Sequence, residues 1–360
     1  MGTKTMRRRH FLMGAGAGLA AGTSPLWADF SEPLYLTAGN RSDNSTWLVG
    51  LTLSGAVRFA LPIPGRGHAA AAHPHLAQAV AFARRPGTFA LVLDCVTGQE
   101  VARLTTPEGR HFYGHGAFSA DGRHLFTTEN AYDIPDGRIG VWDVENGYAR
   151  VGEFPSGGIG PHEIIRLASG DFAVANGGIQ THPDFVRAKL NIPTMQTNLA
   201  FVSADGSLLE TQPLQGEMQK NSVRHIDVDA AGRVVAALQW QGAPTQVVPL
   251  VARFSRGGTP ELLTHPSETR LKHYAGSIAV APDGAEIAVT GPKGGHVIFL
   301  DRQGQPLGDA DIPVASGVAQ SAQGLVISCK GGLVLRNNGV IETVPVAGDW
   351  SWDNHLVRVG

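Results

Sequence analysis

A strand–turn–strand unit that recurs along the chain most strongly limits what this sequence can fold into. Residues 113–130 show it most clearly, as a small and apolar run, a turn at residues 120–122 and a second apolar run. The glycine of the turn tolerates the positive φ that such turns need. Two further strands are predicted at residues 140–144 and 148–154, so four antiparallel strands follow one another closely. A sheet of this size is typical of one blade of a β-propeller.

The same turn chemistry returns at residues 201–206 and 278–284, and in a looser form at 227–232. Self-similarity at this interval indicates a propeller or a solenoid, because one small sheet cannot bury its own faces. Six complete blades are predicted, and they begin near residues 68, 115, 162, 225, 276 and 317.

The two ends of the chain supply the remaining blade. Three short strands are predicted at residues 34–36, 46–51 and 57–59, and a single strand at 352–359 has no partners after it. Pairing the two chain ends would remove the exposed sheet edges that favour aggregation. The sequence therefore predicts an all-β, seven-bladed β-propeller closed by its N- and C-terminal strands.

We expect residues 29–360 to form a single propeller domain with one insertion, at residues 179–197. The insertion interrupts the third blade between its second and third strands. Long loops in compact repeat proteins are usually functional or disordered. This loop is therefore predicted either to cover or contact a ligand or to be disordered.

Residues 1–28 have the pattern of a twin-arginine (Tat) signal peptide. Arg8 and Arg9, separated from Phe11 by one residue, begin the pattern Arg-Arg-x-Phe-Leu, and an apolar run over residues 12–21 and a cleavage region that ends at Ala28 follow. The run is too short for stable insertion into a membrane, although an uncleaved anchor is the alternative. The mature protein is therefore predicted to be periplasmic. The net charge of −2 gives no argument for binding nucleic acid or an anionic membrane.

Histidine recurs at the start of the innermost strand in five of the seven predicted blades. The first three of these histidines follow at an interval of 47 residues, and the insertion accounts for the longer step to the fourth. Innermost strands line the channel of a propeller, so these side chains are predicted to form a ring at one mouth of the channel. Several imidazoles in one place suit a borderline transition metal, and we expect iron or copper. The predicted metal ligands are His68, His115, His162, His225 and His355.

Polar residues are predicted to surround these histidines. The second strand of each blade returns to the face where the first strand begins, and these second strands end in polar residues. Convergent polar groups in a pocket are a candidate binding site. The predicted ligand-binding or supporting residues are Glu129, Asn130, Glu163, Asn176, His182, Asp184, Arg224, Gln239 and Lys293.

A structural role for the histidines is the alternative. In WD repeats a Gly-His pair holds a hydrogen-bond network inside each blade, and repeat proteins copy structural residues for that reason. Here the histidine directly adjoins the inner strand instead of preceding it by several residues. The sequence leaves both interpretations open.

These features together resemble a known bacterial family. The Tat pattern, the blade at residues 114–122, the segment 160–163, and the insertion motifs at 181–184 and 189–191 with Met195 are similar to the domain-of-unknown-function 1513 family. The resemblance covers the mature chain, and the insertion is its most specific part. It implies a YVTN/WD-type propeller whose genes lie beside those of imelysin-like and other periplasmic iron-uptake proteins. No catalytic residues are carried over from it.

Three functions follow as hypotheses. The first is a periplasmic propeller that binds iron, copper or a metal-containing ligand through the histidines in the context of iron uptake. The second is a non-catalytic scaffold that docks imelysin-like or other iron-uptake partners. The third is an oxidoreductase or lactonase-like propeller enzyme, although no Ser-His-Asp order, phosphate loop or paired-carboxylate motif stands out.

Overall fold

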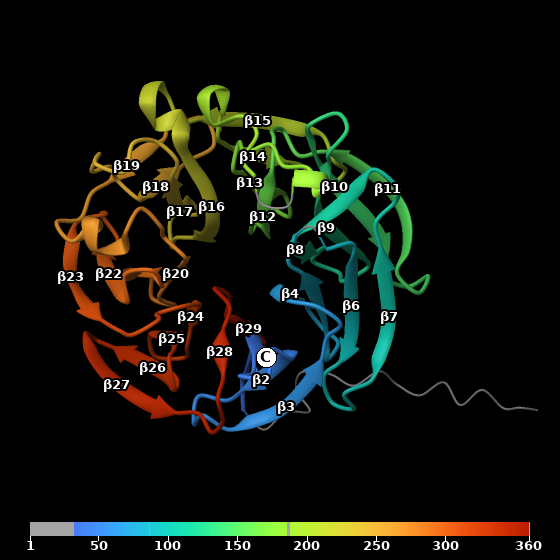
Figure 1. The fold of residues 1–360 in the computed structure, drawn as a ribbon, viewed down its shortest axis with the longest axis horizontal. Coiled ribbons are helices and arrows are strands. Elements are labelled where there is room, and N and C mark those ends of the chain that lie inside the picture. The colour runs from blue at the N-terminus through green and yellow to red at the C-terminus, as the bar shows by residue number, and fades with distance from the viewer. Residues whose placement is uncertain (1–31, 86, 186–187, 360) are drawn as a thin grey trace, which may run out of the picture.

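The chain forms a ring of seven small antiparallel sheets around a central channel (Figure 1). The computed structural model describes residues 32–85, 87–185 and 188–359, so the predicted signal peptide lies outside the described residues. Each sheet is one blade, and in six of the seven the first strand lies at the channel and the last strand at the outer rim. The structure confirms the predicted seven-bladed β-propeller.

Six blades contain four strands each, in chain order from the channel to the rim. The first of these blades contains β4 (Gly67–Ala72), β5 (Gln78–Ala83), β6 (Phe89–Asp94) and β7 (Glu100–Thr105). The second contains β8 (Arg110–Phe118), β9 (His124–Ala131), β10 (Asp136–Asp143) and β11 (Ala149–Pro155). The third contains β12 (Pro161–Arg166), β13 (Phe172–Asn176), β14 (Asn198–Val202) and β15 (Leu208–Pro213).

The next three blades follow the same order. The fourth contains β16 (Asn221–Val228), β17 (Val234–Trp240), β18 (Val251–Phe254) and β19 (Glu261–Leu263). The fifth contains β20 (Ser277–Val280), β21 (Glu286–Gly291), β22 (His296–Asp301) and β23 (Pro306–Asp311). The sixth contains β24 (Val318–Gln320), β25 (Leu325–Cys329), β26 (Gly332–Asn337) and β27 (Val340–Pro345).

The seventh blade closes the ring with strands from both chain ends. It contains β1 (Leu34–Asn40), β2 (Thr46–Leu51), β3 (Val57–Pro62), β28 (Ser351–Trp352) and β29 (Val357–Val359). β1 pairs with β2 on one side, and on its other side with β29, where Leu36 lies opposite Val357, and with β28. The predicted closure by the N- and C-terminal strands is therefore confirmed.

The insertion lies between β13 and β14, where the sequence places it. It contains two short 3-10 helices, η2 (Pro183–Phe185) and η3 (Ile192–Thr194). Two others, η4 (Gly216–Lys220) and η5 (Glu268–Leu271), lie in other connections. No helix among the described residues is long and apolar enough to span a membrane.

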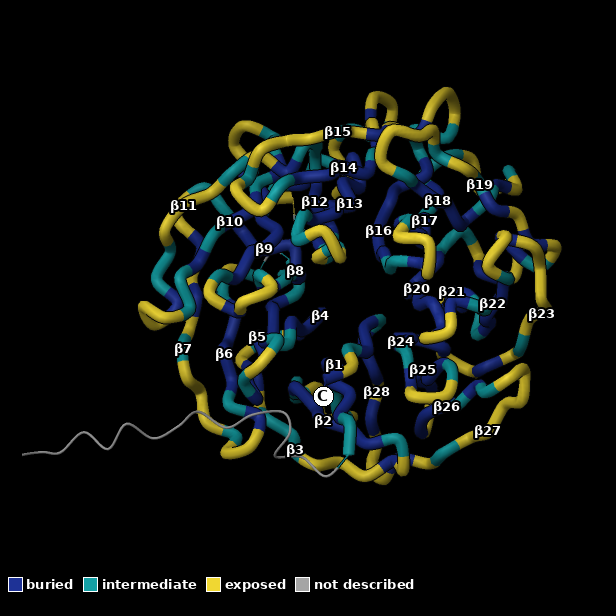
Figure 2. Tube along the Cα trace, turned by 180° about the vertical axis from the view of Figure 1, so that it is seen from behind, coloured by how far each residue is buried: buried dark blue, intermediate teal, exposed yellow. Residues whose placement is uncertain are grey.

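The hydrophobic core lies between neighbouring blades. One cluster joins Leu36 of the closing blade to Ala79 and Leu91 of the first four-stranded blade, and another joins Phe299 to Ile327 across the fifth and sixth. Figure 2 shows the result, with inner strands mostly buried and the outer strands more exposed. Each sheet is thus covered on both faces by its neighbours, which is why repeated sheets need a closed ring.

Closure can be tested at Leu36, which is fully buried on β1 against β29 and the next blade. Leu36→Ala is expected to lower the free energy of unfolding by about 2–5 kcal/mol, because it leaves a cavity at the junction. Val340→Ala, on an outer strand where the side chain is 69% exposed, is the control and should change it by less than about 0.5 kcal/mol. Urea unfolding of both variants measures this, and equal midpoints would contradict it.

Candidate metal centre

The innermost strands are irregular where the five histidines lie. In four blades the register of pairing with the second strand shifts at the histidine or directly beside it. The shifts lie between residues 67 and 70 in β4, 112 and 116 in β8, 161 and 163 in β12, and 223 and 225 in β16. His355 lies in the gap between β28 and β29. Bulges re-aim side chains and interrupt pairing. The irregularities therefore turn these side chains into the channel.

One glycine makes room for this arrangement. Gly114 precedes His115 and has a φ of +103°, which residues other than glycine rarely adopt. A Cβ atom at this position would lie 2.6 Å from the Cδ2 atom of His68. The backbone of one blade thus packs directly on the imidazole of the preceding blade.

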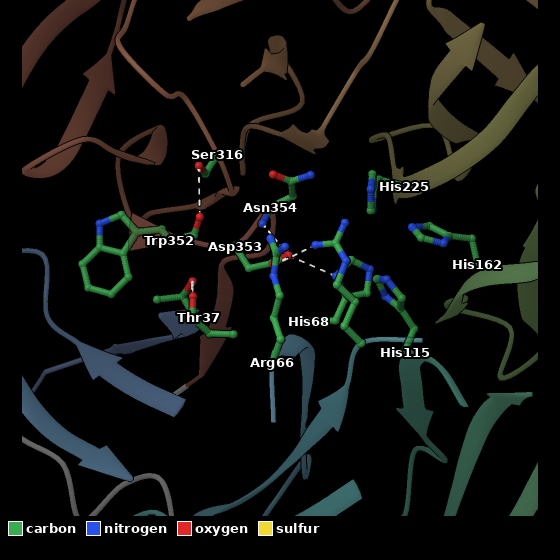
Figure 3. A network of polar contacts seen from close by, with 12 residues as sticks. Thr37, Arg66, His68, His115, His162, His225, Ser316, Trp352, Asp353 and Asn354 are labelled. Carbon is green, nitrogen blue, oxygen red and sulfur yellow. Dashed lines mark hydrogen bonds and ion pairs between the residues drawn. The ribbon is translucent and has the colours of Figure 1, made fainter. Parts of the chain in front are cut away.

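All five imidazoles meet in one buried cluster, which we call the histidine cluster. Their ring centroids are separated by 4.4–6.5 Å in the nine pairs that are in contact. None of the five histidine residues is more than 8% exposed. Figure 3 shows four of these side chains turned toward one another, with Asp353 beside His68. The structure therefore brings together residues that are far apart in the sequence, as the repeat phase predicts.

Two carboxylates contact the Nδ1 atoms of three of the five imidazoles. Asp353 Oδ1 lies 3.0 Å from His68 Nδ1. Glu163 bridges two rings, with Oε1 3.4 Å from His115 Nδ1 and Oε2 3.5 Å from His225 Nδ1. A carboxylate at Nδ1 favours the tautomer whose proton is on Nδ1, and leaves the Nε2 lone pair for a metal ion.

His162 has a different partner. The Arg224 guanidinium lies 3.3 Å from His162 Nδ1, and a guanidinium can only donate. The Nδ1 atom must therefore accept, so the neutral ring carries its proton on Nε2. His162 is thereby set up as a hydrogen-bond donor toward the cluster, unlike the three rings held by carboxylates.

Several nitrogen atoms of the cluster have no partner. The Nε2 atoms of His115, His162 and His355 are buried without a hydrogen bond among the described residues, and the Nδ1 atom of His225 contacts Glu163 at 3.5 Å without hydrogen-bond geometry. An unpaired buried polar group costs about 1–3 kcal/mol. Three groups of side chains place potential metal-binding atoms within 4.8 Å of one another: His68 with His115 and His162, His115 with His225 and His355, and His68 with Asp353 and His355.

Burial keeps the rings of His68, His162, His225 and His355 neutral, which is the form that binds metal. It lowers the pKa of His68 to about 3, although the contact with Asp353 opposes the shift. Burial, then the charge of Arg224 and the neighbouring rings, hold the pKa of His162 well below its usual range. Burial and the neighbouring rings do the same for His355, and burial also lowers the pKa of His225.

The two carboxyl groups stay ionised. Burial by itself would raise their pKa values. The interactions of Glu163 with His115 and His225 outweigh this effect and lower its pKa. For Asp353 the hydrogen bond to His68, together with nearby arginines, has the same result. Two negative charges therefore lie directly behind the imidazoles, where they favour a cation in the cluster.

The histidine cluster lies inside the channel, with a cavity on either side, and not at the channel mouth as predicted. His68, His162 and His225 line a cavity of about 300 Å³ on the side of the insertion. His115 and His355 face larger cavities, of about 1150 and 490 Å³, which follow the innermost strands. The cluster can therefore be approached from two directions.

Other buried histidines show what a structural role looks like in this fold. His73 Nε2 lies 3.1 Å from the carbonyl oxygen of Gly122, and its Nδ1 accepts backbone N–H groups. His265 is bonded in the same way, to Gly308 and Ser267. Both nitrogen atoms of these rings are satisfied by backbone groups. The rings of the cluster contact one another instead, which argues against the structural alternative. Contact with a carboxylate does not by itself do so, because His296 contacts two carboxylates outside the cluster.

Of the predicted supporting residues, four lie at the cluster or at the cavity beside it: Glu163, Arg224, Gln239 and Lys293. Glu129 instead lies within its own blade, paired with Arg150. Asn176 bonds Ser156 and Asn198, and Asn130 bonds the insertion at Thr181. His182 and Asp184 contact each other on the insertion, away from the cluster. Successive side chains on a strand face opposite ways, so a position at a strand end does not ensure that a residue faces the channel.

Sequence reasoning missed Asp353. Its side chain is almost fully buried, and its other oxygen accepts from Arg66 and Arg84 at 3.1 and 3.0 Å. The sequence did contain a signal: an acidic residue lies close to a recurring histidine in both cases. Asp353 lies two residues before His355, and Glu163 directly follows His162. A carboxylate beside a recurring histidine is the pattern that identifies both residues.

The fold and the site define a class of protein, a seven-bladed β-propeller with a buried histidine cluster across its channel. The family model described as "Protein of unknown function (DUF1513)" matches residues 61–359, and the chain belongs to this family. The resemblance found in the sequence is therefore confirmed. No curated protein matches the chain.

Solved structures with the same architecture are distant in sequence. Hydrazine synthase of Kuenenia stuttgartiensis has a TM-score of 0.61 at 13% identity, covering 86% of this chain and 95% of that one. The periplasmic gluconolactonase of Pseudomonas aeruginosa has a TM-score of 0.59 at 14% identity, covering 91% and 99%. A streptogramin B lyase has a TM-score of 0.56 at 14% identity, covering 88% of each chain. At these identities the likeness shows the fold alone.

The buried His68 makes stability depend on pH. The unfolded chain binds a proton at this residue near pH 6.5, but the folded chain does so only near pH 3, with Asp353, Arg84 and His115 facing the ring. The free energy of unfolding of metal-free protein should therefore fall as the pH is lowered from 6.5 toward 3. The contribution of this one site is up to about 1.4 kcal/mol per pH unit.

Urea unfolding of chelator-treated protein at several pH values between 7.5 and 4.5 measures this slope. The slope should be smaller in His68→Gln. His124→Gln, which changes a histidine away from the channel, should keep the slope of the unmodified protein. Equal slopes in all three proteins would show that His68 is not held neutral.

Proposed function

We propose that this protein binds a transition metal ion, iron or copper, through the histidine cluster in its channel. The observation that carries the proposal is that carboxylates face the Nδ1 atoms of His68, His115 and His225 in a cluster where the Nε2 atoms of His115 and His355 are buried without a hydrogen-bond partner. This is the arrangement in which proteins orient metal-binding imidazoles and strengthen them as donors. A bound ion would satisfy the Nε2 atoms of His115 and His355, which the fold leaves unpaired.

Among the five rings, His115, His225 and His355 form the best supported ligand set. One carboxylate, that of Glu163, lies behind two of these rings, and their potential ligand atoms lie within 4.8 Å of one another. Two nitrogen atoms bonded to one ion at about 2.0–2.1 Å can be at most about 4.2 Å apart. Only small side-chain movements are therefore needed for them to share an ion.

The other two rings differ in what they offer. His68 has the same support, from Asp353, and can act as a further ligand. His162 was predicted as a ligand, but its contact with Arg224 places the proton on Nε2. Its role in the proposal is to donate a hydrogen bond to a group bound at the ion. Neutral imidazoles bind iron, copper and zinc alike, so the ligand set alone does not select among these metals.

Metal analysis of the purified protein tests the proposal, followed by titration of the chelator-treated protein with Fe²⁺, Cu²⁺ and Zn²⁺. The unmodified chain should bind a single ion tightly, and the double variant His115→Gln, His355→Gln should lose it. His265→Gln, which removes a buried histidine with a purely structural role, is the matched control and should keep the ion. Absence of metal in native protein, together with no binding in the titration, would refute the proposal.

A second variant separates support from direct coordination. Glu163→Gln keeps the size of the side chain but removes the charge that holds His115 and His225. Metal affinity should fall by about 10–100-fold, since supporting carboxylates of this kind have effects of that size. An unchanged affinity in this variant would show that Glu163 does not act on the site.

The cellular setting stays a prediction from the sequence. Export by the Tat pathway, a periplasmic location and contact with imelysin-like or other iron-uptake proteins depend on residues and partners outside the described structure. Docking of such partners without metal, and catalysis as an oxidoreductase or lactonase, remain the alternative functions. Metal content separates the first alternative from the present proposal.

A further inference from the structure

The cavity on the insertion side of the histidine cluster is strongly basic; we call it the basic pocket. Five basic side chains line its volume of about 300 Å³, and no acidic side chain does so among the described residues. Two tyrosines and two glutamines add neutral hydrogen-bonding groups. The basic lining residues are Arg84, Arg85, Lys189, Arg224 and Lys293.

Arg224 is the most informative of these residues. Its side chain is buried, with only 7% of the residue exposed, and its Nε atom has no hydrogen-bond partner among the described residues. Its contact in the cluster is with the neutral ring of His162, not with a carboxylate. A buried charge without a counter-ion is costly, so this guanidinium calls for an anion that the chain itself does not supply.

The two lysines meet neutral partners as well. Lys189 donates to the amide oxygen of Gln241, and Lys293 lies 4.3 Å from the centre of the Tyr274 ring. Burial, followed by the charges of Arg224, Lys293 and Arg85, lowers the pKa of Lys189. These like charges therefore repel one another, and a bound anion would relieve the repulsion.

We infer that the basic pocket binds a small molecule with two or more carboxylate groups. The basic groups come from four different blades and approach the pocket from several sides, so a single compact charge cannot reach all of them. Guanidinium groups match the flat, two-oxygen geometry of carboxylates. A volume of about 300 Å³ is at the small end of ligand pockets and suits a compact organic acid.

The site lies directly against the histidine cluster, because His68, His162 and His225 line both. Binding of the carboxylate ligand does not require a metal ion in the cluster, since the charges that attract the ligand belong to the chain. The two can therefore be tested separately. A polycarboxylate in this position would also lie within reach of an ion held by the cluster.

Isothermal titration of the full chain tests this inference in protein freed of metal with 1,10-phenanthroline, an uncharged chelator, and then dialysed. The probe is tricarballylate, which carries three carboxylates and chelates metals weakly, with inorganic phosphate as the comparison. Unmodified protein should bind tricarballylate, more weakly as salt is raised, and should bind phosphate less tightly. Lys189→Gln and Lys293→Gln should each weaken tricarballylate binding on the order of ten-fold, the effect of one charge-assisted hydrogen bond.

Lys330→Gln is the matched control. Lys330 is exposed and follows the second strand of its blade, as Lys293 does, but it does not line the pocket. This variant should bind tricarballylate as the unmodified protein does. No binding by unmodified protein, equal binding of phosphate, or unchanged binding in both pocket variants would each overturn the inference.

Discussion

The placement of the site depends on interruptions of the innermost strands. A regular strand would direct its side chains into the contacts between blades, alternately to one face and the other. In β4, β8, β12 and β16 the pairing instead slips at or beside a histidine, and the closing blade has a gap at His355. Because the blades are arranged radially, five local irregularities point at one place. The innermost strands β20 and β24, which lack the histidine, pair regularly with their second strands.

Charge divides the two approaches to the cluster. The carboxylate of Glu163 lies on the side of the larger cavities, and the basic groups around Arg224 lie on the side of the insertion. The same imidazoles therefore face a negative group on one side and positive groups on the other. A cation is favoured among the rings by the carboxylates, whereas an anion is favoured just beyond them by the basic pocket. The two proposals describe adjacent and electrostatically complementary parts of one channel.

Much of this arrangement could be predicted from the sequence, because repeats fix it. Glycine turns at a constant interval set the blades, and the unpaired strands at the two ends predicted the closing blade. The shared phase of His68, His115 and His162 placed them on the channel, since equivalent positions meet at the axis. Such arguments need only the repeat and the symmetry of the fold.

What could not be predicted depends on side-chain direction. Glu129 lies near the end of a second strand and Asn176 ends one, as the repeat indicates, but both side chains contact other strands of their own blades. Asp353 was missed because its partners, His68 and Arg84, lie in a different blade, the first four-stranded one. Contacts between residues so distant in sequence depend on the exact packing of two blades, which a single sequence does not display.

The position of Asp353 and His355 ties the histidine cluster to closure of the ring. Both residues belong to the segment that completes the closing blade, and the backbone N–H of Asp353 donates to the carbonyl of Ala38 on β1. A chain in which this segment has not docked on β1 therefore lacks one of the five imidazoles and one of the two carboxylates. The proposed capture of an ion would follow docking of this segment, so occupancy of the cluster would report that the ring has closed.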